Sequence, residues 1–119
     1  MTEFDSQQFA NALVQGALDG KAEQVVLLDV RQLTFLADYF LICNGTSDRH
    51  ARSVAQHIKD AGDETGMRLN HREGETEARW ILLDWGDVVV HVFDAPTREF
   101  YRLEELWADA PRVVVDLVA

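Results

Sequence analysis

The residues of this sequence best placed to do chemistry are Gly45-Thr46-Ser47, which follow an apolar run and precede a segment of helical periodicity. Amide groups at a helix N-terminus are free to bind phosphate, so a strand-to-helix junction of this composition can hold a nucleotide. Neither the Gly-x-x-x-x-Gly-Lys nor the Gly-x-Gly-x-x-Gly phosphate-binding pattern is present. Serine is also a common helix N-cap, and we favour that structural role for Ser47 over a phosphate site.

A nucleotidyltransferase acting on a magnesium-nucleotide is the alternative function that this junction allows. Such an enzyme needs a nearby pair of strand carboxylates to hold magnesium. The strand expected after the helix, Met67–His71, contains no carboxylate. Asp84 and Asp87 form the nearest pair, with His91 as the only obvious third ligand. They flank a predicted tight turn, where aspartate commonly accepts hydrogen bonds from local amides, so we favour a structural role for both.

The histidines and the single cysteine add no catalytic set. His50 and His57 are seven residues apart on a predicted helix, which separates them by ~10.5 Å along its axis, too far to share a metal. His91 lies in an apolar strand, as buried structural histidines do. Cys43 is also embedded in an apolar strand, where a thiol packs as a small hydrophobic group. We therefore predict that the protein is not an enzyme and that it uses no metal or cofactor.

The stretch from Trp80 to Trp107 contains all three tryptophans of the chain, and we expect any functional surface here. Two apolar runs, Trp80–Leu83 and Val88–Phe93, flank a tetrapeptide in which Gly86 can adopt a positive φ. This pattern predicts a β-hairpin closed by a tight turn. Pro96 ends the second strand, because proline cannot donate to the ladder of a sheet. An aromatic, acidic segment with a helical period then follows.

That aromatic segment, Phe100 to Trp107, cannot bury all its apolar side chains along one helical stripe, since Tyr101 and Leu103 diverge by ~200°. Either Phe100, Leu103 and Trp107 are core residues with Tyr101 at their edge, or part of the set contacts a partner. From Trp80 to Trp107 there are six acids and two bases, so the local charge is two minus six, or −4. An acidic rim around exposed aromatic residues suits a basic protein, and the residues alone leave both alternatives open.

The charge of the whole chain limits its partners. Its 119 residues include 21 acids against 11 Lys and Arg, a formal net charge of −10. Phosphate contacts are made by Lys and Arg, so we expect no direct nucleic-acid specificity and no binding to anionic membranes. A basic protein patch fits better, although a negative charge also simply aids solubility.

The length of the chain permits one domain, which we place at residues 1–107 with a short C-terminal tail at 108–119. The N-terminus has no basic, apolar leader, and no apolar run approaches the ~20 residues that span a bilayer. One cysteine excludes an internal disulfide and fits a reducing compartment. We therefore expect a cytoplasmic protein.

The elements follow from periodicity and capping signals. We predict a connector at Arg31–Asp38 that Leu33, Phe35 and Leu36 pin to the core. The predicted helices and strands, in order, are a helix from the capping box Asp5/Gln8 to Gly20, strands at Gln24–Val30 and Tyr39–Cys43, a helix from Ser47 to Gly62 or Gly66, a weak strand at Met67–His71, the hairpin, and the short aromatic helix. This order predicts an α/β fold, or α+β by some criteria, with a mixed sheet of about five strands and packed helices.

Several motifs, taken in their order and spacing, resemble the ribosomal silencing factors, also called Iojap-related proteins. The resemblance runs from about Asp5 to Trp107. Trp85 stands where the family often has a tyrosine or aliphatic residue, a change that a turn tip tolerates. The matching motifs are Leu28-Asp29-Val30, Ala37-Asp38-Tyr39-Phe40, Gly45-Thr46-Ser47-x-Arg49, Glu73-Gly74, the hairpin from Trp80 to Phe93, and Arg98-x-Phe-Tyr101-x-Leu103-Glu104-x-Leu106-Trp107.

This resemblance implies a nucleotidyltransferase-like fold without the catalytic acids. It also implies a translation repressor that binds large-subunit ribosomal protein number fourteen and thereby blocks joining of the small subunit. Carried over to this sequence, the family's protein-binding residues are Trp80, Asp84, Tyr101, Leu103 and Glu104. Because the same stretch has surplus apolar residues, we also expect the free protein to be a homodimer.

Overall fold

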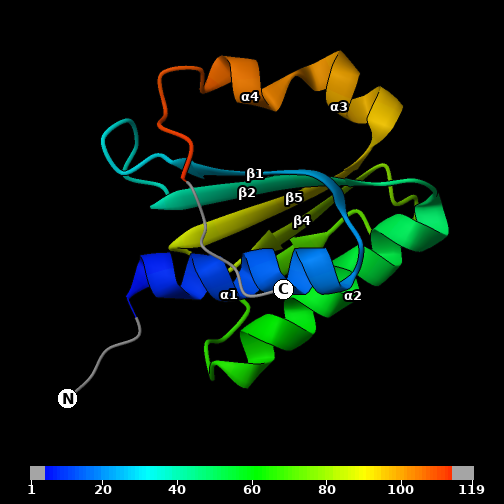
Figure 1. Cartoon of the computed structure of the whole chain (residues 1–119), viewed down its shortest axis with the longest axis horizontal. Helices are drawn as coiled ribbons and strands as arrows, with labels where there is room; N and C mark the ends of the chain where they lie inside the picture. Colours follow the sequence, from blue (N-terminus) through cyan, green and yellow to red (C-terminus); the bar gives the residue numbers. More distant parts are fainter. Residues whose placement is uncertain (1–4, 114–119) are drawn as a thin grey trace.

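The computed structural model describes residues 5–113, which form one mixed five-stranded sheet with helices on both faces (Figure 1). The strand order is β1-β2-β5-β4-β3, in which β2 and β5 are parallel and every other neighbouring pair is antiparallel. The prediction of a mixed five-strand sheet with packed helices is confirmed, with the antiparallel pairings making it an α+β fold.

Two long helices, α1 (Ser6–Asp19) and α2 (Asp48–Glu64), cover one face of the sheet. The predicted capping box opens α1, where the Asp5 carboxylate accepts from the Gln8 amide at 2.8 Å. Ser47 caps α2 as predicted, since its Oγ accepts from the His50 amide. Because the chain places apolar side chains on one stripe of each helix, both pack against the same large core cluster.

The central strands are buried on both sides, as their unbroken apolar sequences predict. They are β2 (Tyr39–Gly45) and β5 (Val88–Asp94). The strand β1 (Glu23–Asp29) lies at the edge of the sheet and is buried only at Leu27 and Leu28. Alternate residues of β2 and β5 point to opposite faces of the sheet. Tyr39, Leu41 and Cys43 join the core beneath α1 and α2, and Phe40 and Ile42 join a second cluster on the other face.

The predicted hairpin forms between β4 (Trp80–Asp84) and β5, with Gly86 at φ +91°. Trp85, however, is buried against Phe9 and Gly62. The side chain at this turn folds back beneath α1 and α2, where it fills the space that the missing Cβ of Gly62 leaves.

The third strand also differs from its prediction. β3 covers His71–Glu73 rather than Met67–His71, and it pairs with β4 at the far edge of the sheet from β1. Met67 and Leu69 instead pack as partly buried residues against the core under α2. The apolar side chains of this segment therefore contact the core, although the segment itself does not pair as a strand.

Two short helices, α3 (Ala95–Tyr101) and α4 (Leu103–Leu106), form the upper layer of Figure 1 and cover part of the second face. The Asp94 side chain caps α3, and Pro96 lies in its first turn, where a missing N–H costs nothing. Arg102 interrupts the helical segment because it adopts a left-handed conformation, with φ 47° and ψ 51°. The single predicted helix is thus two helices that meet at an angle.

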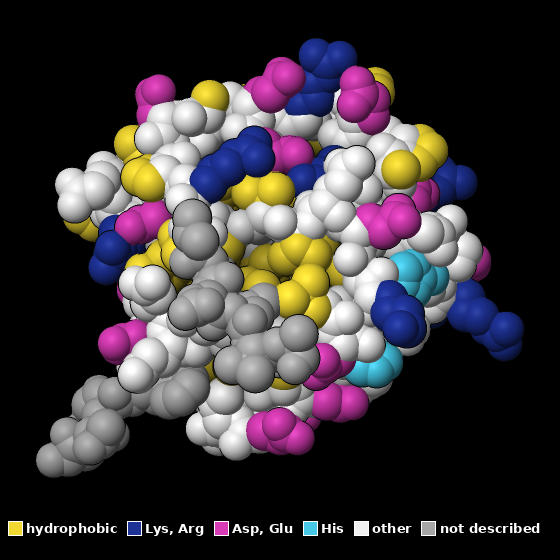
Figure 2. All heavy atoms as spheres, viewed as in Figure 1, with side chains coloured by type: hydrophobic (Ala, Val, Ile, Leu, Met, Phe, Trp, Pro, Cys, Tyr) yellow, Lys and Arg dark blue, Asp and Glu magenta, His cyan; other side chains and the backbone are white. Residues whose placement is uncertain are grey.

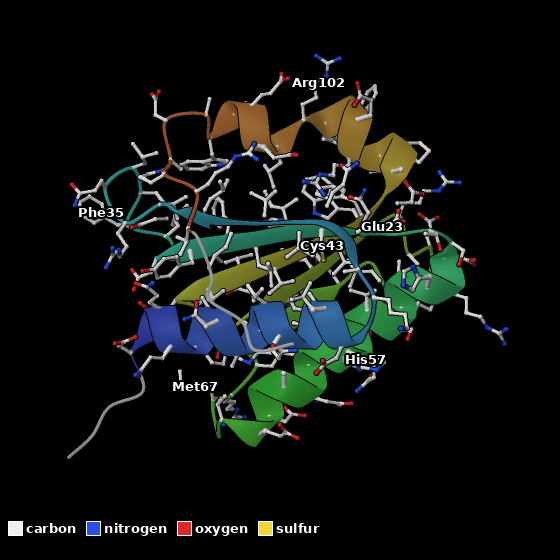
Figure 3. The ribbon with its side chains drawn as sticks, in the orientation of Figure 1. Glu23, Phe35, Cys43, His57, Met67 and Arg102 are labelled. Carbon is white, nitrogen blue, oxygen red and sulfur yellow. The ribbon has the colours of Figure 1, made fainter. Side chains whose placement is uncertain are left out.

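The connector between β1 and β2 does not pin its apolar side chains to the core. Leu33, Phe35 and Leu36 are all exposed, and Phe35 points away from the body of the protein (Figure 3). Our prediction for this connector was wrong. Its anchors are Ala37, which is buried, and backbone hydrogen bonds such as that from the Val30 amide to the Asp38 carbonyl.

The chain beyond Trp107 continues along the outer edge of β1. Ala110 is buried in the second cluster, the Asp29 amide donates to the Pro111 carbonyl, and the Val113 amide donates to the Leu27 carbonyl. Residues 108–113 of the predicted tail therefore lie against the sheet. The remainder of that tail, 114–119, is outside the described residues.

Candidate docking surface

The Gly45–Ser47 junction is occupied by the protein's own side chains. The Thr46 amide donates to His50 Nδ1 at 2.8 Å, and the His50 amide donates to Ser47 Oγ at 3.0 Å. Gly45 has a packing role, because a Cβ there would lie 2.5 Å from the backbone nitrogen of Ala51. These contacts support the helix-cap interpretation of the motif over a phosphate site.

The residues considered for metal or nucleophilic chemistry are also held in structural roles. Asp84 Oδ1 accepts from the Gly86 amide at 2.7 Å, as aspartate does in tight turns. Burial raises the pKa of the Cys43 thiol to about 12, so this thiol stays protonated in the middle of the sheet (Figure 3). Between residues 5 and 113, no three His, Cys, Asp or Glu side chains are grouped so that they could hold a metal ion.

The upper face of the sheet is only partly covered by α3 and α4. On β4, the alternation of the strand turns Trp80, Leu82 and Asp84 toward this face, and all three remain partly exposed. On β3, Glu73 pairs with Leu82 and is fully outside the core. The result is an open strip of sheet beside α3.

Trp80 and Tyr101 join this strip to α3. Their ring centroids are 4.9 Å apart, and Trp80 also lies 4.9 Å from the ring of Phe93 beneath it. Tyr101 is 50% exposed and Phe100 is 79% exposed, and their own rings pack edge to face at 5.0 Å. Of the residues that the core alternative names, Leu103 belongs to the second core cluster and Trp107 packs against it, whereas Phe100 faces solvent beside Tyr101.

A groove of about 680 Å³ runs between the rings of Trp80, Phe100 and Tyr101 on one side and the β3–β4 loop on the other. Trp80, Phe100, Tyr101 and Pro96 line its apolar side, and Glu77 and Arg79 are among its polar residues. Grooves with an apolar floor and a few charged residues at the rim are typical binding surfaces. Acidic side chains also follow α3 and α4 along the upper edge of the molecule, around the arginines there (Figure 2).

Arg98 fixes the two short helices to the sheet. Its guanidinium, only 7% exposed, donates to the Gln24 carbonyl at 2.7 Å, to Asn44 Oδ1 at 2.8 Å, and twice to Glu104 Oε2 at 2.8 and 2.9 Å. Burial opposes ionisation of Glu104, but the hydrogen bonds and charge of Arg98, a backbone amide and the charge of Arg112 together outweigh it and keep the pKa of this carboxyl below its usual value. By contrast, Arg102 points outward into solvent (Figure 3).

The five predicted site residues all belong to the upper layer or the strand facing it, but they do not form one cluster. Trp80 and Tyr101 are in contact, with Tyr101 exposed and Trp80 partly exposed. Leu103 lies below them in the second cluster, and Glu104 is bound to Arg98. Asp84 sits at the opposite end of β4 from Trp80. Leu82 and Phe100 are exposed parts of this surface that the prediction omitted, although the alternation of β4 could have indicated Leu82.

Comparison with known proteins then decides the family. The family model described as "Ribosomal silencing factor during starvation" matches residues 3–119. The chain belongs to this family. Ribosomal silencing factor RsfS of Bacillus subtilis is 49% identical over 98 residues, covering 82% of this chain and 83% of that protein. The chloroplastic protein Iojap of Zea mays is 34% identical, covering 86% of this chain and 44% of that longer protein.

Solved structures agree with the fold. A crystal structure from Bacillus halodurans superposes with a TM-score of 0.81 at 40% identity, covering 92% of this chain and 99% of the other. An X-ray structure from Chromobacterium violaceum gives a TM-score of 0.86 at 28% identity, covering 97% of this chain and 95% of the other.

Family membership supports a role in regulating translation. No helix within residues 5–113 is long and apolar enough to cross a membrane.

Proposed function

We propose that the protein is a cytoplasmic, non-enzymatic translation repressor. It binds the large ribosomal subunit through ribosomal protein number fourteen and thereby blocks joining with the small subunit. Membership of the ribosomal silencing factor family supports this proposal. The observation that carries it is the contact between the partly exposed Trp80 and the exposed Tyr101 beside an open groove.

The chemistry of this surface fits a protein partner with basic residues. Trp and Tyr are among the side chains most enriched at interface hot spots, and here the Trp80 ring packs against both Phe93 and Tyr101. Glu73 and Glu77 stand at the rim, and the whole chain carries −10. A factor with this charge is repelled by ribosomal RNA, so its docking is restricted to an exposed basic protein surface.

The same surface also supports our proposal of a homodimer in the free protein. Phe100, Tyr101 and Leu106 are exposed apolar side chains on two adjacent short helices, and a second copy could cover them. Sedimentation at tens of micromolar should give a dimer mass, with the Tyr101→Ala variant shifted toward monomer. A monomer mass for the parent protein at that concentration would rule out this part of the proposal.

The decisive experiment replaces Trp80 or Tyr101 by alanine and measures co-sedimentation with large subunits and inhibition of subunit joining. Truncating an interface hot spot costs about 2 kcal/mol or more, roughly thirtyfold in affinity. Phe35→Ala is the control, since Phe35 is a fully exposed aromatic residue on the β1–β2 connector, away from the groove. We expect Phe35→Ala to bind like the parent. A Trp80 or Tyr101 variant that melts like the parent and still binds with full affinity would contradict the proposed surface.

Charge reversal tests the rim separately. Glu104 is unsuitable because it is bound to Arg98, so we choose Glu77→Lys, at the groove, with Glu64→Lys at the end of α2 as control. Glu77→Lys should slow association several-fold at low salt, and Glu64→Lys should not.

Calorimetry with magnesium and nucleoside triphosphates should show no site tighter than millimolar. A micromolar site would favour the nucleotidyltransferase alternative.

A further inference from the structure

A buried histidine lies directly beneath the exposed tryptophan of the docking surface. His91, in β5, is 8% exposed, and its Nδ1 accepts a hydrogen bond of 3.0 Å from Trp80 Nε1. The two residues are diagonal neighbours across the β4–β5 pair, since Trp80 pairs with Phe93 and His91 pairs with Leu82. Indole nitrogen is only a donor, so His91 must be neutral with its proton on Nε2.

The other nitrogen of the imidazole is not paired in the same way. His91 Nε2 is buried and has no hydrogen-bond partner within the described part of the chain. The ring of Phe40 lies 5.4 Å away, edge to face, and the ring of Phe93 lies 6.3 Å away, stacked. A leucine would satisfy this apolar site better than an imidazole with an unpaired N–H, so packing alone does not account for histidine here.

The arrangement gives Trp80 a buried acceptor for its indole N–H. Its indole is partly exposed, its ring packs against Phe93 and Tyr101, and its N–H is turned inward to His91. Without the acceptor, the N–H would be unpaired unless the ring turned to place it in water. The hydrogen bond therefore selects the rotamer in which the apolar edge of the indole is presented at the surface.

We propose that His91 is a positioning residue that holds the indole of Trp80 in its docking orientation through the Trp80 Nε1–His91 Nδ1 hydrogen bond. This inference rests on the proposed function, because it takes Trp80 as a contact residue for the large subunit. It assigns to His91 no contact with the partner: the imidazole acts only through Trp80.

The hydrogen bond is tested first without the ribosome. In ¹⁵N-labelled parent protein, the three tryptophans should give three indole N–H signals, and Trp80→Phe identifies the signal of Trp80. This signal should exchange slowly with solvent and show a scalar coupling to His91 Nδ1 across the hydrogen bond. His91→Asn places an amide oxygen near the Nδ1 position and should keep the protection, whereas His91→Leu should lose it. Absence of both the coupling and the protection in the parent protein would overturn the inference.

The consequence for docking is tested next. His91→Leu should bind large subunits about three- to tenfold more weakly, the loss of one hydrogen bond, with a free energy of unfolding equal to or above that of the parent. His91→Asn should bind within about twofold of the parent. In the Trp80→Phe background, where no indole N–H exists, His91→Leu should change affinity by less than about twofold.

The outcomes separate the two proposals. If Trp80→Ala binds with full affinity while the indole signal still responds to His91, the docking surface is wrong and the hydrogen bond stands. If Trp80→Ala fails to bind but His91→Leu and His91→Asn both bind like the parent, the positioning role of His91 is refuted. If His91→Leu does not fold, the coupling in the parent and the His91→Asn comparison still decide the question.

Discussion

Replacing Arg98 by methionine should detach the α3–α4 layer from the sheet. Methionine keeps much of the aliphatic stem but removes all four hydrogen bonds of the guanidinium. These bonds join α3 to β1 through the Gln24 carbonyl, to β2 through Asn44, and to α4 through Glu104. Arg98 is therefore the one polar group that connects both short helices to two strands within the described residues.

The expected loss in free energy of unfolding follows from the polar groups that the substitution leaves without a partner. Breaking a buried ion pair by removing one partner costs about 3–5 kcal/mol, and a buried acceptor left without a donor costs about 1–3 kcal/mol. The Glu104 side chain is 22% exposed and can be partly rehydrated, whereas Asn44 is buried. We therefore expect Arg98→Met to lower the free energy of unfolding by about 3–5 kcal/mol, a large part of the stability of a small domain.

Urea denaturation followed by circular dichroism measures this loss. Arg102→Met is the matched control, because Arg102 is four residues away on the same segment and its ion pairs with Glu99 and Glu105 are exposed. Removing exposed pairs should cost less than about 1 kcal/mol. Arg98→Lys should remain well below the parent, since an ammonium cannot reproduce the fork of bonds. If Arg98→Met and Arg102→Met were equally stable, our account of the Arg98 network would be refuted.

Two other predictions concern the core. Burial lowers the pKa of His91 to about 4, against about 6.5 for a free histidine, so below pH 6.5 the unfolded chain takes up a proton that the folded protein does not. His91 should therefore reduce stability by about 1.4 kcal/mol per unit as the pH falls from 6.5 to 4, about 3 kcal/mol in all, and be without effect above pH 7. Urea midpoints of the parent and His91→Leu across this range test it; a difference independent of pH would contradict it. Gly45→Ala should lose about 1–3 kcal/mol, because the added methyl meets the backbone of Ala51, and an unchanged thermal midpoint would show that α2 shifts freely.

Much of the fold could be predicted because its signals are local. The caps at Asp5 and Ser47, the positive φ of Gly86, and the apolar strand around Cys43 each depend on a few neighbouring residues. Propensity, capping and turn chemistry act over such short distances, so they can be read without knowing what packs against them.

The sequence was least informative for side chains whose burial depends on residues far away in the chain. Phe35 was expected to pin its connector to the core and is exposed, whereas Trp85, in the hairpin turn, is buried. Both are aromatic residues in connecting segments, and local sequence does not reveal whether a cavity is available. For Trp85 it is, because Gly62 of α2 lacks a side chain.

For the candidate site too, some features follow from the sequence and others only from the tertiary structure. The sequence by itself determined the residue types, the alternation that turns Trp80 and Leu82 to one face, and, through its motifs, the family. Tertiary structure alone decided that Tyr101 lies 4.9 Å from Trp80, and that His91 accepts the indole N–H. It also decided that Arg98 finds its acceptor on Gln24, 74 residues earlier in the chain. Such contacts depend on how strands and helices pack together in space, and no periodicity within one element encodes them.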